Sequence, residues 1–222
     1  QNGITNFVSL LDNIMVGQVG TEQMSGVAIA NQLVFIFNLC IFGAVAGAGI
    51  LGAQFYGSGN SEGVRDTFRF KLLFGVILSA IFAVIFLTVG EPLIQQFIHQ
   101  GEGIGDLEAT RSYGKAYLEV IVIGILPFAL TQCYSGTLRE TGETVIPMIA
   151  GIIAVCVNLV FNYILIFGKL GAPELGCVGA AIATVLSRFV DLAIVAGWTH
   201  KHVARNPLIR GALRSFKIPG SL

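Results

Sequence analysis

Long apolar stretches, separated by short segments rich in glycine and charged residues, make up most of this 222-residue chain. A bilayer core about 30 Å thick requires about 20 predominantly apolar residues in helical form. On this basis the pattern predicts six membrane-spanning helices, at residues 1–17, 24–56, 66–89, 114–137, 145–167 and 176–198. The first stretch is too short to span alone, and we expect it to be the truncated remainder of a longer helix. We therefore predict an all-α, polytopic membrane protein with six transmembrane helices.

Two features modify the regularity of these helices. The stretch at 24–56 is longer than the bilayer requires, which predicts that it tilts or extends beyond the membrane. Pro127 falls in the middle of the stretch at 114–137, where a proline removes a backbone hydrogen bond and bends a helix. We expect a kink there.

The distribution of Lys and Arg between alternate loops predicts the orientation. Cytoplasmic loops carry an excess of these residues. Nine Lys and Arg fall in or beside one set of loops, against three in the other set. The loops at 57–68 and 138–144 and the basic segment at 201–222 are therefore predicted to be cytoplasmic, in a multi-pass protein of the cell membrane.

The composition narrows the class further. Only 12% of the residues are charged, about half of what soluble domains carry, and the formal net charge is zero, which gives no support to a nucleic-acid partner. The four cysteines lie in or beside apolar runs and are interpreted as small buried hydrophobes. No nucleotide-binding, nucleophile-elbow or zinc-protease motif occurs, so we expect neither an enzyme nor a bound cofactor.

A carboxylate and two carboxamides within the apolar stretches are the candidate functional residues. An aspartate at the centre of a membrane helix costs about 2.5–3.5 kcal/mol on insertion scales. Asp12 either reaches the outer interface or is a titratable or cation-binding group in a wet cavity, and the second reading is favoured. Asn158 and Asn162 lie one turn apart on one helical face. They supply either oxygen ligands for a hard cation or hydrogen bonds between helices.

Other polar positions are less specific. Ala180 and Thr184 have the same one-turn spacing in the last helix, and a threonine hydroxyl is an oxygen ligand too. Asn38 is a candidate for the lining of a substrate cavity, together with Asp12 and Asn162. Arg188 and Asp191 are three residues apart, and we expect them to form a self-neutralising pair near the cytoplasmic end of their helix.

The chain resembles the multidrug and toxic compound extrusion (MATE) family. The resemblance covers nearly the whole chain and is carried, in order, by DNIMVGQVG, AGAGILGAQFYGSGNSEGVRDTFRF, SGTLRETGETVIPM, VNLVFNYILIFG and LGCVGAAIATVLSR. It implies twelve helices in two lobes, of which residues 1–200 resemble the N-terminal six-helix lobe. Residues 201–222 would then be the inter-lobe linker, and the C-terminal lobe is missing from this chain.

The resemblance also implies a function. Members of the family expel drugs and organic cations in exchange for Na⁺ or H⁺. Asp12 matches the carboxylate central to coupling, and Asn158 and Asn162 match a pair on the fifth helix. Ala180, through its main-chain oxygen, and Thr184 match contributors to the cation site from the sixth helix. Some members carry an acid where this chain has Asn162, so the choice between Na⁺ and H⁺ stays open.

Two other functions are considered. A flippase for lipid-linked oligosaccharides should place several Arg or Lys in its cavity to hold pyrophosphate, whereas Arg188 alone is intramembrane here. A non-transporting membrane scaffold would not need Asp12, so Asp12→Asn would leave its activity and ion-dependent stability unchanged. We expect a cation-coupled exporter.

Overall fold

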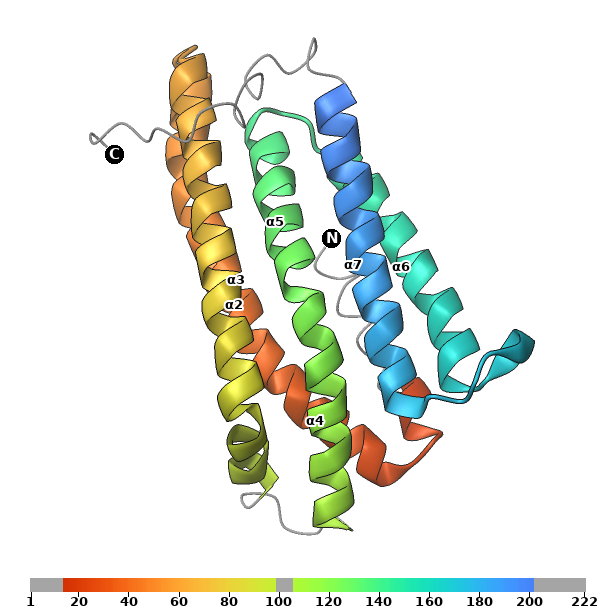
Figure 1. The fold of residues 1–222 in the computed structure, drawn as a ribbon. Coiled ribbons are helices and arrows are strands. Elements are labelled where there is room, and N and C mark those ends of the chain that lie inside the picture. Colours follow the sequence, from red (N-terminus) through yellow and green to blue (C-terminus); the bar gives the residue numbers. More distant parts are fainter. Residues whose placement is uncertain (1–13, 99–105, 202–222) are drawn as a thin grey trace.

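The computed structural model describes residues 14–98 and 106–201, and this part of the chain is built from helices without strands. Residues 14–17 are helical, and the named elements follow in chain order: α2 (Thr21–Gly57), α3 (Ser61–Ile98), α4 (Leu107–Ile123), α5 (Ile125–Glu140), α6 (Val145–Ile166), the short 3-10 helix η1 (Lys169–Gly171) and α7 (Gly176–Lys201). Figure 1 shows these helices running side by side as one elongated bundle.

The helices α2 and α3 are the longest elements. They have 37 and 38 residues, about 55 Å at 1.5 Å per residue, so both exceed the thickness of a bilayer core. The predicted stretch at 24–56 agrees closely with α2. The stretch at 66–89 is too short at both ends, because α3 begins at Ser61 and continues through Pro92 to Ile98.

The predicted single span at 114–137 is bent in the structure. It consists of α4 and α5, which meet at Gly124 at an angle of 47°. Pro127 has no N–H to donate to the carbonyl of Ile123, so the helical hydrogen bonding is interrupted in the preceding turn. The expected kink is confirmed, with the break three residues before the proline.

Four described helices are long and apolar enough to cross a membrane, or five spans if α4 and α5 count as one. These five correspond to the last five predicted stretches. Six spans are not confirmed, because most of the first predicted stretch, residues 1–13, lies outside the described residues.

Small residues allow the helices to approach one another closely. A Cβ on Gly26 of α2 would collide with backbone atoms of Thr110 and Gly114 in α4, and one on Gly179 of α7 would collide with the carbonyl of Leu165 in α6. The Gln23 side-chain oxygen accepts a hydrogen bond from the Cys177 N–H at 2.8 Å, which ties the start of α2 to the start of α7. These contacts bring the backbones of α2 and α4, and of α6 and α7, close together and tie α2 to α7.

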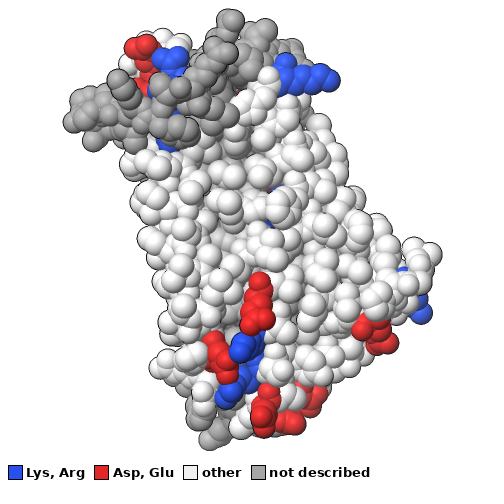
Figure 2. Space-filling model, in the orientation of Figure 1, with Lys and Arg blue, Asp and Glu red and all other residues white. Residues whose placement is uncertain are grey.

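Many large hydrophobic side chains lie on the surface of the bundle. Phe35, Ile50 and Leu87 are each more than 60% exposed, although they are large hydrophobic residues. Figure 2 shows a broad band of uncharged side chains across the middle of the molecule, with charged side chains mostly at its two ends. This distribution suits a bundle surrounded by lipid rather than water.

The loops that the charge distribution groups together lie at one end of the molecule. The α2–α3 turn, the α5–α6 turn and the C-terminal end of α7 share that end, and the α6–α7 connection lies at the other (Figure 1). The described basic residues Arg65, Arg69, Arg139 and Lys201 therefore belong to the same end of the bundle. That this end faces the cytoplasm stays a prediction.

Candidate functional site

The predicted site residues of α6 and α7 lie in the packed interface between these two helices. Asn158 and Asn162 of α6 are 3% and 0% exposed, and Ala180 of α7 is 2% exposed. Thr184, one turn after Ala180, is half-buried. We call Asn158, Asn162, Ala180 and Thr184 the amide cluster.

A chain of hydrogen bonds joins three members of the amide cluster. The Asn162 Nδ2 donates to the Asn158 Oδ1 at 3.1 Å, and the Asn158 Nδ2 donates to the Thr184 Oγ1 at 3.3 Å. The asparagine pair was expected either to supply oxygen ligands or to form hydrogen bonds between helices. The same groups do connect α6 to α7 by a hydrogen bond, and they also bring amide and hydroxyl oxygens together. Such oxygens are the ligands that hard cations prefer.

The other two predicted site residues stand apart from this cluster in what the structure describes. Asp12 lies outside the described residues. Val16, four positions later, is fully buried in the same apolar cluster as Ala180. Asn38, on α2, is half-buried, and its Oδ1 is buried without a hydrogen-bond partner.

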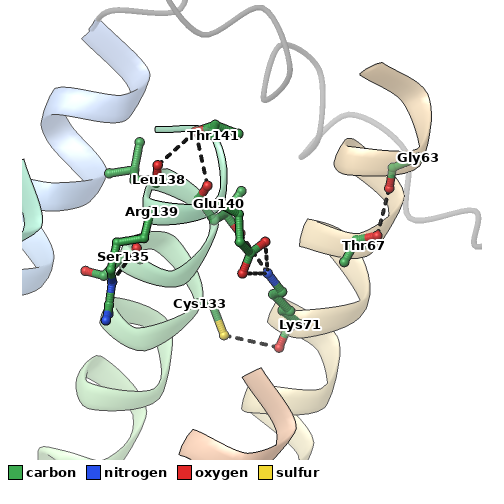
Figure 3. Close-up of polar contacts among 10 residues, drawn as sticks. Gly63, Thr67, Lys71, Cys133, Ser135, Leu138, Arg139, Glu140 and Thr141 are labelled. Atoms are coloured by element: carbon green, nitrogen blue, oxygen red, sulfur yellow. Dashed lines mark hydrogen bonds and ion pairs between the residues drawn. The ribbon is translucent and has the colours of Figure 1, made fainter. Parts of the chain in front are cut away.

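A buried ion pair between α3 and α5 was not predicted. The Lys71 Nζ lies 2.5 and 2.6 Å from the two carboxylate oxygens of Glu140 and 3.4 Å from the Thr137 Oγ1. The lysine side chain is 1% exposed and the glutamate side chain 14% exposed. Figure 3 shows Lys71 and Glu140 pointing toward one another from the two helices, with the Cys133 thiol bonded to the Lys71 carbonyl.

Two glycines of α2 make room for this ion pair. A Cβ on Gly49 or on Gly52 would collide with a carboxylate oxygen of Glu140. Three helices, α2, α3 and α5, thus meet around one largely buried carboxylate. From the sequence, Lys71 was counted among the positive charges beside the 57–68 loop. Its partner lies 69 residues away, so no local pattern could reveal the pair.

The expected pair of Arg188 and Asp191 is wrong. No ion pair between them occurs in the described part of the chain. The Arg188 guanidinium instead lies over the Phe128 ring, 5.0 Å from its centroid, and its side chain passes over Gly124 at the break between α4 and α5. The face of the Phe128 ring attracts the guanidinium, and Gly124 leaves room for the arginine side chain to reach it.

Comparisons with known proteins give one consistent result. The family model described as MatE matches residues 1–164. A probable multidrug resistance protein NorM of Thermotoga maritima is 33% identical over 196 residues, which are 88% of this chain and 40% of that protein. A multidrug resistance protein NorM of Vibrio parahaemolyticus is 27% identical over 191 residues, 86% of this chain and 40% of that protein.

Solved structures agree. The crystal structure of a MATE protein in the bent conformation matches with a TM-score of 0.83 and 25% identity, over 98% of this chain and 46% of that one. An inward-facing MATE family transporter matches with a TM-score of 0.71 and 25% identity, over 86% of this chain and 41% of that one.

The chain spans about two fifths of the length of the curated relatives that it matches, a length that fits one lobe of a two-lobe protein. These relatives are named for multidrug resistance and for transport, not for catalysis. With the family model matching well over half of its residues, this chain belongs to the MatE family.

Proposed function

We propose that this chain is the N-terminal lobe of an antiporter that exports drugs and organic cations in exchange for Na⁺ or H⁺. Residues 1–200 form the six-helix lobe, and residues 201–222 form a basic cytoplasmic linker to a second lobe. The family membership supports export of drugs, and the 40% coverage of the curated relatives supports a second lobe of similar size.

The observation that carries the coupling proposal is the buried, hydrogen-bonded amide cluster. Four of the five proposed site residues lie in one interface, and the two asparagines and Thr184 are joined by hydrogen bonds. Polar groups at membrane depth usually mark an ion or substrate path. Asp12 is proposed as the fifth member, because it matches the coupling carboxylate of the family.

The hydrogen bonds of the cluster indicate how the site would respond to Na⁺. The Asn158 Oδ1 accepts from the Asn162 amide. Na⁺ would compete with that N–H for the oxygen, so the Asn162 carboxamide would turn its own oxygen toward the ion. The backbone oxygen of Ala180, the Thr184 hydroxyl and the Asp12 carboxylate would complete an all-oxygen site.

A proton would act differently on the same residues. Protonated Asp12 would become a hydrogen-bond donor, and the amide cluster offers oxygens to accept that bond. Either cation neutralises Asp12. Coupling then requires only that the ion bind one conformation better, at about 1.4 kcal/mol for each tenfold preference.

Drug efflux from vesicles tests this function. The complete two-lobe protein is reconstituted, Na⁺ and pH gradients are imposed separately, and wild type is compared with Asp12→Asn. We expect efflux driven by at least one gradient and its loss in the variant. Loss of a Na⁺-driven component identifies the oxygen cage, and loss of only a pH-driven component identifies protonation. Gradient-driven efflux that Asp12→Asn leaves intact would contradict the proposal.

A further inference from the structure

Arg188 of α7 carries a positive charge inside the bundle that has no counter-ion in the described part of the chain. Its Nη1 is buried without a hydrogen-bond partner, and none of the ion pairs among residues 14–98 and 106–201 includes it. Asp191, three residues later, interacts electrostatically with Arg139 of α5 instead, and its Oδ1 is also buried without a hydrogen-bond partner. A guanidinium stays protonated in proteins, so the charge of Arg188 is permanent.

The contacts of Arg188 lower the cost of burying its charge without cancelling that charge. The guanidinium lies over the Phe128 ring, 5.0 Å from its centroid, and Gly124 leaves room for the side chain to reach it. The face of an aromatic ring attracts a cation through its quadrupole, which carries no net charge. A carboxylate partner would neutralise the arginine, as Glu140 does for Lys71. The electric field of Arg188 therefore still acts on its surroundings.

Arg188 continues the row of α7 residues that belong to the amide cluster. Ala180, Thr184 and Arg188 are spaced four residues apart, so they lie on one face of the helix, about 6 Å from one to the next along its axis. The Cα–Cβ bond of a helical residue tilts toward the helix N-terminus, which for Arg188 is the direction of Thr184. The Thr184 hydroxyl accepts the hydrogen bond from Asn158 of α6. A permanent positive charge thus belongs to the helical turn next to the proposed cation site.

We propose that Arg188 weakens Na⁺ binding at the amide cluster by electrostatic repulsion, so that the ion can be released. This inference rests on the Na⁺ form of the proposed function. An exporter that takes up an ion on one side of the membrane has to release it on the other, and a site that binds too tightly would keep its ion. At a separation on the order of 10 Å and an effective dielectric constant of about 20, one unit charge changes the affinity for a monovalent cation roughly tenfold.

Thermal unfolding of the purified protein tests the effect of this charge. Na⁺ replaces choline at constant ionic strength, and the midpoint is the Na⁺ concentration that gives half of the maximal stabilisation. Arg188→Met and Arg188→Gln remove the charge, and both should lower the midpoint roughly tenfold. Arg188→Lys keeps the charge and should stay near the wild-type midpoint. Lys201→Met removes the same charge from an exposed position about 20 Å farther along α7, and it should leave the midpoint unchanged.

Phe128→Leu separates the charge of the arginine from a purely structural role. This variant removes the ring beneath the guanidinium and keeps the charge. It should lower the unfolding temperature measured without Na⁺ and leave the Na⁺ midpoint near that of wild type. If Arg188 served only to hold α7 against α5, then Arg188→Met and Phe128→Leu would both raise the midpoint.

The outcomes distinguish this inference from the proposed function. A wild-type Na⁺ midpoint that Arg188→Met and Arg188→Gln leave unchanged or raise would overturn the inference and leave the Na⁺ site standing. A Na⁺ response that appears in these variants but not in wild type would support it, because the wild-type site would then bind too weakly to fill. Absence of a Na⁺ response from all of these proteins would overturn the inference together with the Na⁺ form of the proposed function. Efflux driven by a pH gradient would still test the proton form.

Discussion

Two groups of polar side chains within this bundle differ in charge: the amide cluster is neutral, and the Lys71–Glu140 pair is charged. The amide cluster joins α6 to α7 through neutral groups, so its members can exchange partners without leaving a charge exposed to an apolar interior. Lys71 and Glu140 neutralise each other at a distance of 2.5 Å. Separating them would leave a charge without its counter-ion in the interior. The cluster therefore suits a site that changes state, and the ion pair suits a fixed junction.

Glu140→Gln is predicted to destabilise the protein by about 3 kcal/mol, because it leaves the Lys71 ammonium buried without its counter-ion. The free energy of unfolding in detergent measures the effect. Arg65→Gln is the matched control, since it breaks the Arg65–Glu62 pair, in which the glutamate is 84% exposed. The control should change stability by less than about 1 kcal/mol. Equal losses of stability in the two variants would contradict a stabilising role of the Lys71–Glu140 pair.

At the scale of elements, glycines of α2 differ in what they face. Gly49 and Gly52 are packed against the Glu140 carboxylate, whereas a Cβ on Gly43 or Gly47 would meet no atom within 4 Å. One face of α2 therefore packs against the Lys71–Glu140 pair between α3 and α5. Another face, at Gly43 and Gly47, is not covered by any described residue.

Gly52→Ala should destabilise the protein by about 1–3 kcal/mol, the usual cost of overpacking a filled site, because the added methyl collides with Glu140. Gly47→Ala on the same helix should be neutral or stabilising by up to about 1 kcal/mol, since alanine is the better helix former. Thermal unfolding of the two variants measures the difference. A similar loss in both would mean that the cost comes from α2 as a whole.

The positions of the helices were easier to predict from the sequence than the side-chain contacts between them. The length of the apolar stretches located the five candidate spans, and Pro127 located the bend. Both features depend on residues that are close together in the sequence. The spacing of Asn158 and Asn162 placed them on one face of α6, and the structure joins both to Thr184 through the Asn158 carboxamide. The wrong Arg188–Asp191 pair and the missed Lys71–Glu140 pair depend on contacts with other helices, which periodicity does not encode.

At the scale of the whole molecule, charge is concentrated at the two ends of an apolar bundle (Figure 2). The basic loops grouped by the positive-inside rule do share one end. The same arrangement assigns the α6–α7 connection, with Glu174, to the opposite side of the membrane.

Cysteine labelling in intact cells checks this orientation. Glu174→Cys should react with a membrane-impermeant maleimide added outside, whereas Ser58→Cys in the α2–α3 turn should react only after the cells are opened. Both positions are exposed in the structure, so a difference reports sidedness and not burial. The parent chain serves as the control for reaction at its own exposed cysteines, Cys40 and Cys156. The reverse labelling pattern would show that the protein has the opposite orientation.

The most direct test of the ion site is the thermal unfolding of purified protein, measured as Na⁺ replaces choline at constant ionic strength and, separately, as pH is lowered without Na⁺. A cation at ten times its dissociation constant stabilises by about 1.4 kcal/mol. We predict that at least one series raises the unfolding temperature of wild type and that Asp12→Asn abolishes the rise. Asn162→Ala should abolish a Na⁺ response, and Asn31→Ala, a control amide bonded to Tyr117, should retain it. A wild type indifferent to both cations, or an undiminished response in Asp12→Asn, would contradict the account.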